Sequence, residues 1–457
     1  MTNRLDRDFH LPGLLRFALP TIIMMLVVSL YTIVDGVLIA RLVGENALAA
    51  ANVAYPAISF TLAMGIMLGT GGSAVVAHKM GAGYLEEARR DFGFLALVAV
   101  CIGLAVCLAG ALFAGPLARL LGASDLLLDD TVTYLRVQLC FAPMAMLQLL
   151  FESFFVTAGR PGLGLGLATA AGVTNAVLDY LYMGPMQMGI LGAALGTVTG
   201  YSIPAVVGVL FFLLRRQGLR FGRPHGDLRM LGRACFNGAS EMVTNLSMAV
   251  TTFLFNAIMM AYLGEAGVSA ITIVLYAQFL LVALYMGFSM GVAPVFSFNR
   301  GAGRYDRMRR IFGYCLRFIL VSSVAILVVA LALSGVVVGI FSTPGSQVYA
   351  IALDGFRRFA PAFLFAGVNI FSSALFTALS DGRTSAIISF ARTFGFLLLG
   401  LLLLPRMLEV DGVWLAVPLA ELLSCLLSVW FLRRKRADFG FGGGDLPRHG
   451  GRGGGRT

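Results

Sequence analysis

The chain has 457 residues, of which 58% are hydrophobic and only 12% are charged, whereas soluble domains carry about 25% charged residues. Its net charge of +11 arises mainly from arginines in short segments between apolar runs, a distribution that indicates membrane topology and argues against nucleic-acid binding. The six cysteines and four histidines show no metal-binding spacing. This composition predicts an all-α integral membrane protein.

Twelve apolar runs follow one another along the chain, and a membrane span needs roughly 20 apolar residues. Residues 1–11 lack the apolar core of a cleavable leader, so we expect the first run to be retained. The predicted spans are 11–40, 51–77, 92–114, 131–157, 161–183, 190–214, 232–262, 269–298, 311–336, 349–379, 384–404 and 412–432. They predict an N-lobe at 11–214, a cytoplasmic linker loop at 215–231, a C-lobe at 232–432 and a disordered Gly/Arg-rich cytoplasmic tail at 433–457.

Basic residues test this count, because they should concentrate on one side of the membrane. Alternate connections and the two terminal segments hold 25 Lys and Arg residues, whereas the other connections hold only Arg41, Arg119 and Arg406. Since cytoplasmic loops carry the excess, both termini are predicted to be cytoplasmic.

The chain also repeats itself. Residues 81–94, GAGYLEEARRDFGF, match residues 301–314, GAGRYDRMRRIFGY, at seven of fourteen positions. Later matches, such as GILGAA at 189–194 with GVWLAV at 412–417, have an offset of 223. Two parallel six-span repeats predict two pseudo-symmetric lobes around a central cavity, which suits alternating access.

Oxygen-bearing side chains in three spans of the first half fall at similar depth. Asp35 lies six residues before Arg41, about 9 Å below the predicted outer end of its helix. Asn175 and Asp179 share one face of another helix, and Thr197 lies about 10 Å deep on a third. Two nearby carboxylates cannot both stay charged cheaply, so this set predicts a proton site or a hard-cation site.

Structural roles are the alternatives for these residues. Asp35 or Asp179 could cap a broken helix, and Thr197 could bond to its own helix. The positions offset from Asp35 and Asp179 are Phe255 and Leu402, so the second half holds no copy. That asymmetry favours a functional role.

Several other polar or flexible residues are candidates for a substrate cavity. Amides in spans often bridge helices instead, and a lone glutamate near a helix end can act as a cap. The candidates are Glu241, Gln278, Asn369, Met286 and Met290. We expect Arg392 and Glu421 to form an ion pair within the second half, which is a simpler account than contact with substrate. We expect Glu152 and Arg136 to have structural roles.

Five segments resemble the MATE (multidrug and toxic compound extrusion) family of secondary transporters, most of all its bacterial drug-efflux branch. They are LYTIVDGVLIARLVGENALAA, GGSAVVAHKMGAGYLEEARRDFG, AGRPGLGLGLATAAGVTNAVLDYLYM, GILGAALGT and GVWLAVPLAELLS. The resemblance covers about residues 11–432. It implies efflux of organic, often cationic compounds driven by H⁺ or Na⁺, and an ion site in the first lobe at Asp35, Asn175, Asp179 and Thr197.

These observations predict a secondary active multidrug exporter in the inner membrane of a bacterium. The alternative is a lipid-linked saccharide flippase of a related fold, which would need a cavity lined by several cations. The spans hold no GxSxG or HExxH, so we expect no enzyme activity. We expect no cofactor and no metal beyond a Na⁺ ion at the coupling site. The expected partners are small organic substrates and membrane lipids, and the expected state is a monomer.

Overall fold

The computed structural model describes residues 4–436, 438 and 439, and all regular structure within them is helical. The first half begins with a short 3₁₀ helix, and its fourth span is a bent pair of helices with an angle of 55°. Its elements are η1 (Arg4–Asp6), α1 (Leu11–Leu42), α2 (Glu45–Gly81), α3 (Leu85–Leu120), α4 (Leu128–Cys140), α5 (Ala142–Thr157), α6 (Pro161–Met183) and α7 (Gly189–Leu214).

The second half contains two long helices with sharp kinks. Gly264 (φ 62°, ψ −151°) interrupts α8, and Glu409 (φ 51°, ψ −130°) interrupts α14. Its elements are α8 (Leu228–Gly301), α9 (Tyr305–Ala332), α10 (Ser334–Phe341), α11 (Gln347–Phe359), α12 (Ala362–Ala378), α13 (Gly382–Phe390), the π-helical η2 (Ala391–Leu397) and α14 (Leu398–Arg434).

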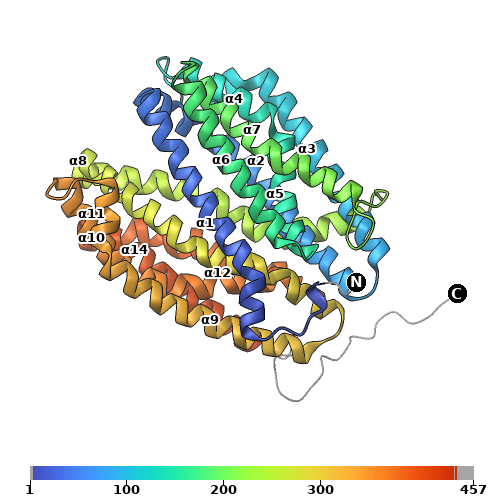
Figure 1. Cartoon of the computed structure of the whole chain (residues 1–457). Coiled ribbons are helices and arrows are strands. Elements are labelled where there is room, and N and C mark those ends of the chain that lie inside the picture. The colour runs from blue at the N-terminus through green and yellow to red at the C-terminus, as the bar shows by residue number, and fades with distance from the viewer. Residues whose placement is uncertain (1–3, 437, 440–457) are drawn as a thin grey trace.

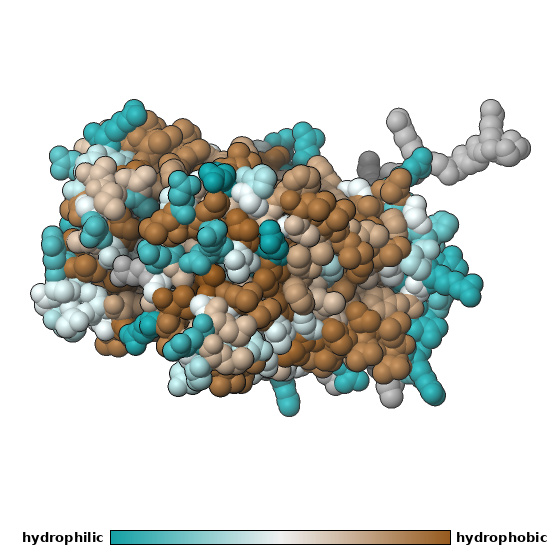
Figure 2. All heavy atoms as spheres, turned by 90° about the horizontal axis from the view of Figure 1, so that it is seen from above, coloured by the Kyte–Doolittle hydropathy of each residue, from teal (hydrophilic) through white to brown (hydrophobic). Residues whose placement is uncertain are grey.

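Length and composition alone identify eight membrane-spanning helices, or ten when the bent pairs α4–α5 and α11–α12 each count as one span. The kinks at Gly264 and Glu409 each divide one long helix into two passes, which gives twelve. The predicted fold class is therefore confirmed. Figure 2 shows apolar residues over much of one face, as a membrane protein requires, with hydrophilic residues at both ends and some between them.

The last helix extends slightly into the segment predicted as the tail, 433–457. α14 continues to Arg434, and Phe439 is buried, with its ring 6.0 Å from the ring of Phe376. Residues 440–457 lie outside the described residues.

Each half is preceded in the chain by a short segment, and that segment packs on the other half. Asp6 of η1 pairs with Arg304 next to α9. In the linker, the backbone N–H of Gly222 donates to the carbonyl of Arg89 in α3 at 3.0 Å, and Phe221 stacks on Phe92 at 4.8 Å. The linker is therefore a packed segment of the first half. Its end is fixed as well: the N–H groups of Met230 and Arg229 bond to Asp227, cap α8 and hold the pKa of that carboxyl below its usual value.

The two halves meet along backbone contacts at glycines. Gly81 of α2 lies against the backbone of Phe298 in α8, and Gly301 of α8 lies against the backbone of His78 in α2. These two contacts are related by the repeat offset of 220 residues, so a pseudo-twofold axis passes between α2 and α8.

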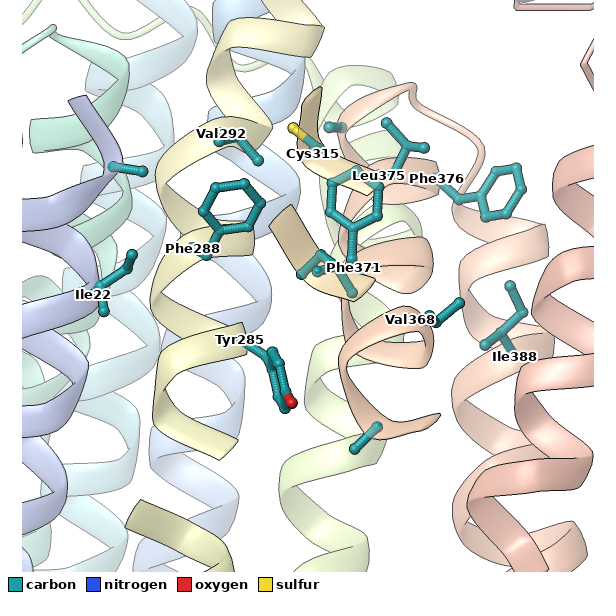
Figure 3. Packing of buried hydrophobic residues seen from close by; sticks show 14 of the residues in the cluster. Ile22, Tyr285, Phe288, Val292, Cys315, Val368, Phe371, Leu375, Phe376 and Ile388 are labelled. Atoms are coloured by element: carbon teal, nitrogen blue, oxygen red, sulfur yellow. The ribbon is translucent and has the colours of Figure 1, made fainter. Parts of the chain in front are cut away.

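Further contacts of the same kind flank this axis. Gly71 lies against Gly238, and Gly287 lies against Ile22 of α1. A Cβ atom at these glycines would overlap the opposing backbone. Figure 3 shows Ile22 beside Phe288 and Val292 at this junction. We call Gly71, Gly81, Gly238, Gly287 and Gly301 the glycine interface.

The glycine interface lies toward one end of the molecule. Figure 1 shows the two halves together near the start of α1 and spread apart at the opposite end. The end near the start of α1 also carries Lys79 in the last turn of α2, Arg215 after α7 and Arg304 after α8, and we call it the basic end. In this conformation the halves are closed at the basic end.

Candidate functional site

The first half brings two carboxyl groups together between α1 and α6. Asp179 is fully buried, Asp35 is half-buried, and their carboxyl groups lie close enough to share a hydrogen bond when one is protonated. Asn175 donates from Nδ2 to Oδ2 of Asp179 at 2.8 Å. Within the described residues, Oδ1 of each aspartate is buried without a hydrogen-bond donor. Such a pair needs a shared proton or a bound cation, because two adjacent buried charges repel.

Thr197 is not part of this contact. Its hydroxyl donates to the carbonyl of Ala193 in its own helix at 3.0 Å. The structure thus joins three of the four predicted residues, and the Thr197 hydroxyl makes the bond to its own helix that was the structural alternative.

Two tyrosines stand near the aspartates, and the sequence analysis did not single them out. Tyr134 lies within electrostatic range of Asp35 and Asp179, and Tyr201 lies within range of Asp35. Tyrosine is common in membrane spans, so the sequence carried no distinguishing signal for either.

Gly196 of α7 supports the buried aspartate, and the sequence analysis missed it. A Cβ at Gly196 would overlap the carboxylate of Asp179, and a Cβ at Gly200 would lie 3.3 Å from Cβ of Asn175. The signal was present, because glycines at 192, 196 and 200 recur every four residues, the spacing that allows two membrane helices to approach closely.

Replacing Gly196 with alanine is expected to displace the Asp179 side chain. The overpacking should destabilise the protein by about 1–3 kcal/mol, seen as a lower melting temperature in detergent. Gly166→Ala in α6 is the matched control: open space surrounds it, and removing a helical glycine should leave stability unchanged or raise it by up to about 1 kcal/mol. Equal melting temperatures for the two variants would contradict the assigned packing role.

A cavity of about 250 Å³ lies between the two halves. Helices α1, α2 and α5 line it on one side, and α8 and α12 on the other. The predicted residues Glu241, Met286 and Met290 line it, and so does Glu152, for which a structural role was expected. Glu152 Oε1 accepts a hydrogen bond from Gln148 at 3.1 Å, and its side chain also reaches the cavity wall.

A second cavity of about 220 Å³ lies within the second half and shares Glu241 and Met286 with the first. Gln278, a predicted cavity residue, lines this second cavity together with Arg392 and Glu421.

Arg392 and Glu421 form the expected ion pair. Arg392 donates from Nε and Nη2 to Oε1 of Glu421 at 2.8 and 2.6 Å. Asn369, a predicted cavity residue, lines neither cavity. It donates to Oε2 of Glu421 at 2.7 Å and accepts from Ser428 at 3.0 Å, so it bridges helices.

A membrane bundle of two repeated six-helix halves around a central cavity is the construction of a secondary transporter. The sequence model of the MatE family matches residues 20–181 in the first half and 242–402 in the second. The chain belongs to the MatE family, which confirms the resemblance seen in the sequence, and members of this family are transporters rather than enzymes.

Similar proteins include two named multidrug export protein MepA. One, from Staphylococcus haemolyticus (strain JCSC1435), is 23% identical over 428 residues, which cover 92% of each chain. The other, from Staphylococcus aureus (strain MSSA476), is 23% identical over 434 residues, which cover 92% of this chain and 94% of the relative.

Solved structures share the fold. A crystal structure of MATE in complex with MaL6 has a TM-score of 0.88 at 18% identity, and covers 93% of this chain and 96% of that chain. An outward-facing conformation of a multidrug resistance MATE family transporter of the MOP superfamily has a TM-score of 0.87 at 18% identity, with the same coverage.

Proposed function

We propose that this protein exports organic, often cationic compounds from a bacterial cell in exchange for H⁺ or Na⁺. The contact between Asp35 and Asp179, with a donorless buried oxygen on each, is the observation that carries the proposal. The naming of similar proteins as multidrug export proteins supports it. The proposed location is the bacterial cytoplasmic membrane, with both termini and the basic end on the cytoplasmic side.

The chemistry of the central cavity favours a cationic cargo. Glu152 and Glu241 are the charged residues among those that line it, and Met25, Met286 and Met290 add adaptable apolar surface. A lipid-linked saccharide carries phosphate and would call for basic side chains. The acidic lining therefore favours the exporter over the flippase.

Coupling requires that the ion and the cargo stabilise different conformations. A proton or Na⁺ at the aspartate pair would remove the repulsion between α1 and α6 and favour a tighter packing of these helices. Asn175 holds one oxygen of Asp179 in place, which leaves the other for the ion. Met25, Val28 and Ser29 of α1 also line the central cavity, so movement of α1 would alter the cargo site.

The test uses proteoliposomes loaded with a fluorescent organic cation, with a pH gradient and a Na⁺ gradient imposed separately. We expect efflux against the concentration gradient to follow one of the two ions, and that ion is the coupling ion. Protein-free liposomes control for leakage of the dye. If neither gradient drives efflux and polyprenyl-phosphate lipids raise the melting temperature more than organic cations do, the flippase replaces the exporter.

A further inference from the structure

Three arginines converge at the basic end of the first half. Arg215 follows α7, Arg160 lies between α5 and α6, and Arg89 belongs to α3. The Arg215 guanidinium lies over the Phe211 ring, 5.3 Å from its centroid. Burial, and then the charges of Arg160 and Arg89, lower the pKa of Arg215. The cluster therefore concentrates positive charge in a partly buried place.

The hydrogen bonds of Arg215 are incomplete. Its Nη2 donates to the carbonyl of Ala158 at 3.3 Å, whereas its Nη1 is buried and has no acceptor among the described residues. Arg89 is satisfied by Glu86 and by the carbonyl of Gly218. Across residues 4–436, 438 and 439, no salt bridge supplies a carboxylate to Arg215.

The second half has a carboxylate beside the basic residue that follows its last helix, and the first half lacks one. Lys435, just after α14, bonds to Oδ2 of Asp381, the residue before α13, at 2.5 Å and to Oγ1 of Thr384 in the first turn of α13 at 2.6 Å. With the offset of 223 residues, Gly159 and Arg160 match Gly382 and Arg383, so Ala158 stands at the position of Asp381. Arg215 and Lys435 are not aligned by this offset, but each is the first residue after the helix that ends its half. At that place the second half supplies a carboxylate, and the first half supplies only a backbone carbonyl.

The cluster lies where a lipid headgroup can reach it. Leu213 and Leu214, at the end of α7, are 60% and 77% exposed, and this helix is a candidate membrane span. The exposed Arg216 and Arg220 follow immediately. The change from exposed leucines to arginines marks the membrane boundary, where phospholipid phosphates lie.

We propose that Arg215, with Arg160 and Arg89 beside it, binds a phosphate group, supplied by the headgroup of an anionic phospholipid or by free phosphate. The phosphate oxygens accept from the buried Nη1 of Arg215, for which a phosphate is a stronger acceptor than a neutral carbonyl. The bound phosphate takes the place that the Asp381 carboxylate occupies beside Lys435.

Native mass spectrometry of the delipidated full-length protein, titrated with phosphatidylglycerol, tests this proposal. We expect Arg215→Gln to weaken binding of the tightest phosphatidylglycerol about fivefold. Arg223→Gln, which removes an exposed arginine from the same linker, should bind as the wild type does. Ala158→Asp should mimic Asp381, neutralise Arg215 within the chain and weaken lipid binding by a similar factor.

Thermal unfolding separates the two phosphate sources. Stabilisation by phosphatidylglycerol alone, lost in the Arg215→Gln variant, identifies a lipid headgroup. The same Arg215-dependent stabilisation by inorganic phosphate, relative to chloride at equal ionic strength, identifies free phosphate. Equal lipid and phosphate responses in the wild type, Arg215→Gln and Ala158→Asp would overturn the proposal. If one variant does not fold, the other decides.

Discussion

Replacement of Asp179 with asparagine is expected to reduce ion-driven export strongly and to leave binding of organic cations intact. Asparagine keeps the volume of the buried side chain, but it can neither release a proton nor neutralise a Na⁺ ion. The cargo cavity is lined by other residues, so its affinity for cations should persist. Uphill efflux should fall on the order of 100-fold, the upper end of typical coupling free energies.

Efflux from proteoliposomes and melting-temperature shifts with organic cations give the two readouts. Asp35→Asn should behave as Asp179→Asn does, because the two carboxyl groups act as a pair. Asp354→Asn removes the charge of a side chain that is 59% exposed, and this variant should transport normally. Wild-type uphill rates in both aspartate variants would reduce the pair to a structural contact and leave Glu152 and Glu241 as coupling candidates.

Replacement of Glu421 with glutamine should cause the largest loss of stability. The change leaves Arg392 in the second half without its counter-charge. Breaking a buried pair in this way costs about 3–5 kcal/mol, and we expect the lower figure because the Arg392 side chain is 17% exposed. The melting temperature in detergent measures the effect.

Two comparisons isolate the ion pair as the cause. A double variant, Arg392→Met with Glu421→Met, should recover much of the loss, because neither charge remains unpaired. Asp411→Asn breaks an exposed pair with Arg358 and should cost less than about 1 kcal/mol. A double variant less stable than Glu421→Gln would show that packing at these positions matters more than charge.

The spans and their order could be predicted from the sequence, because runs of apolar residues and alternating arginines record each membrane crossing. The common depth of Asp35, Asn175 and Asp179 could also be predicted, because the rise per residue of a helix is fixed. The rotation of each helix could not be predicted. A helix that is apolar all round gives no clue to its inward face, so Glu152 was not assigned to the cavity and Asn369 was.

Side-chain partners were a second limit. Whether the Thr197 hydroxyl turns to its own backbone or to Asp179 depends on rotamers that a sequence does not record. That Arg215 has only a backbone carbonyl as partner, whereas Lys435 has a carboxylate, depends on the positions of side chains in both halves, which a sequence does not record.

The glycine interface has a consequence for how this protein can diverge over evolutionary time. Substituting Gly81 or Gly301 would push one backbone into another, so few mutations there can be inherited. The walls of the central cavity consist largely of side chains such as Met286, Met290 and Ile370. Because these side chains border open space, other apolar residues can replace them. Descendants can therefore change which compounds they accept while the contact between their halves stays the same.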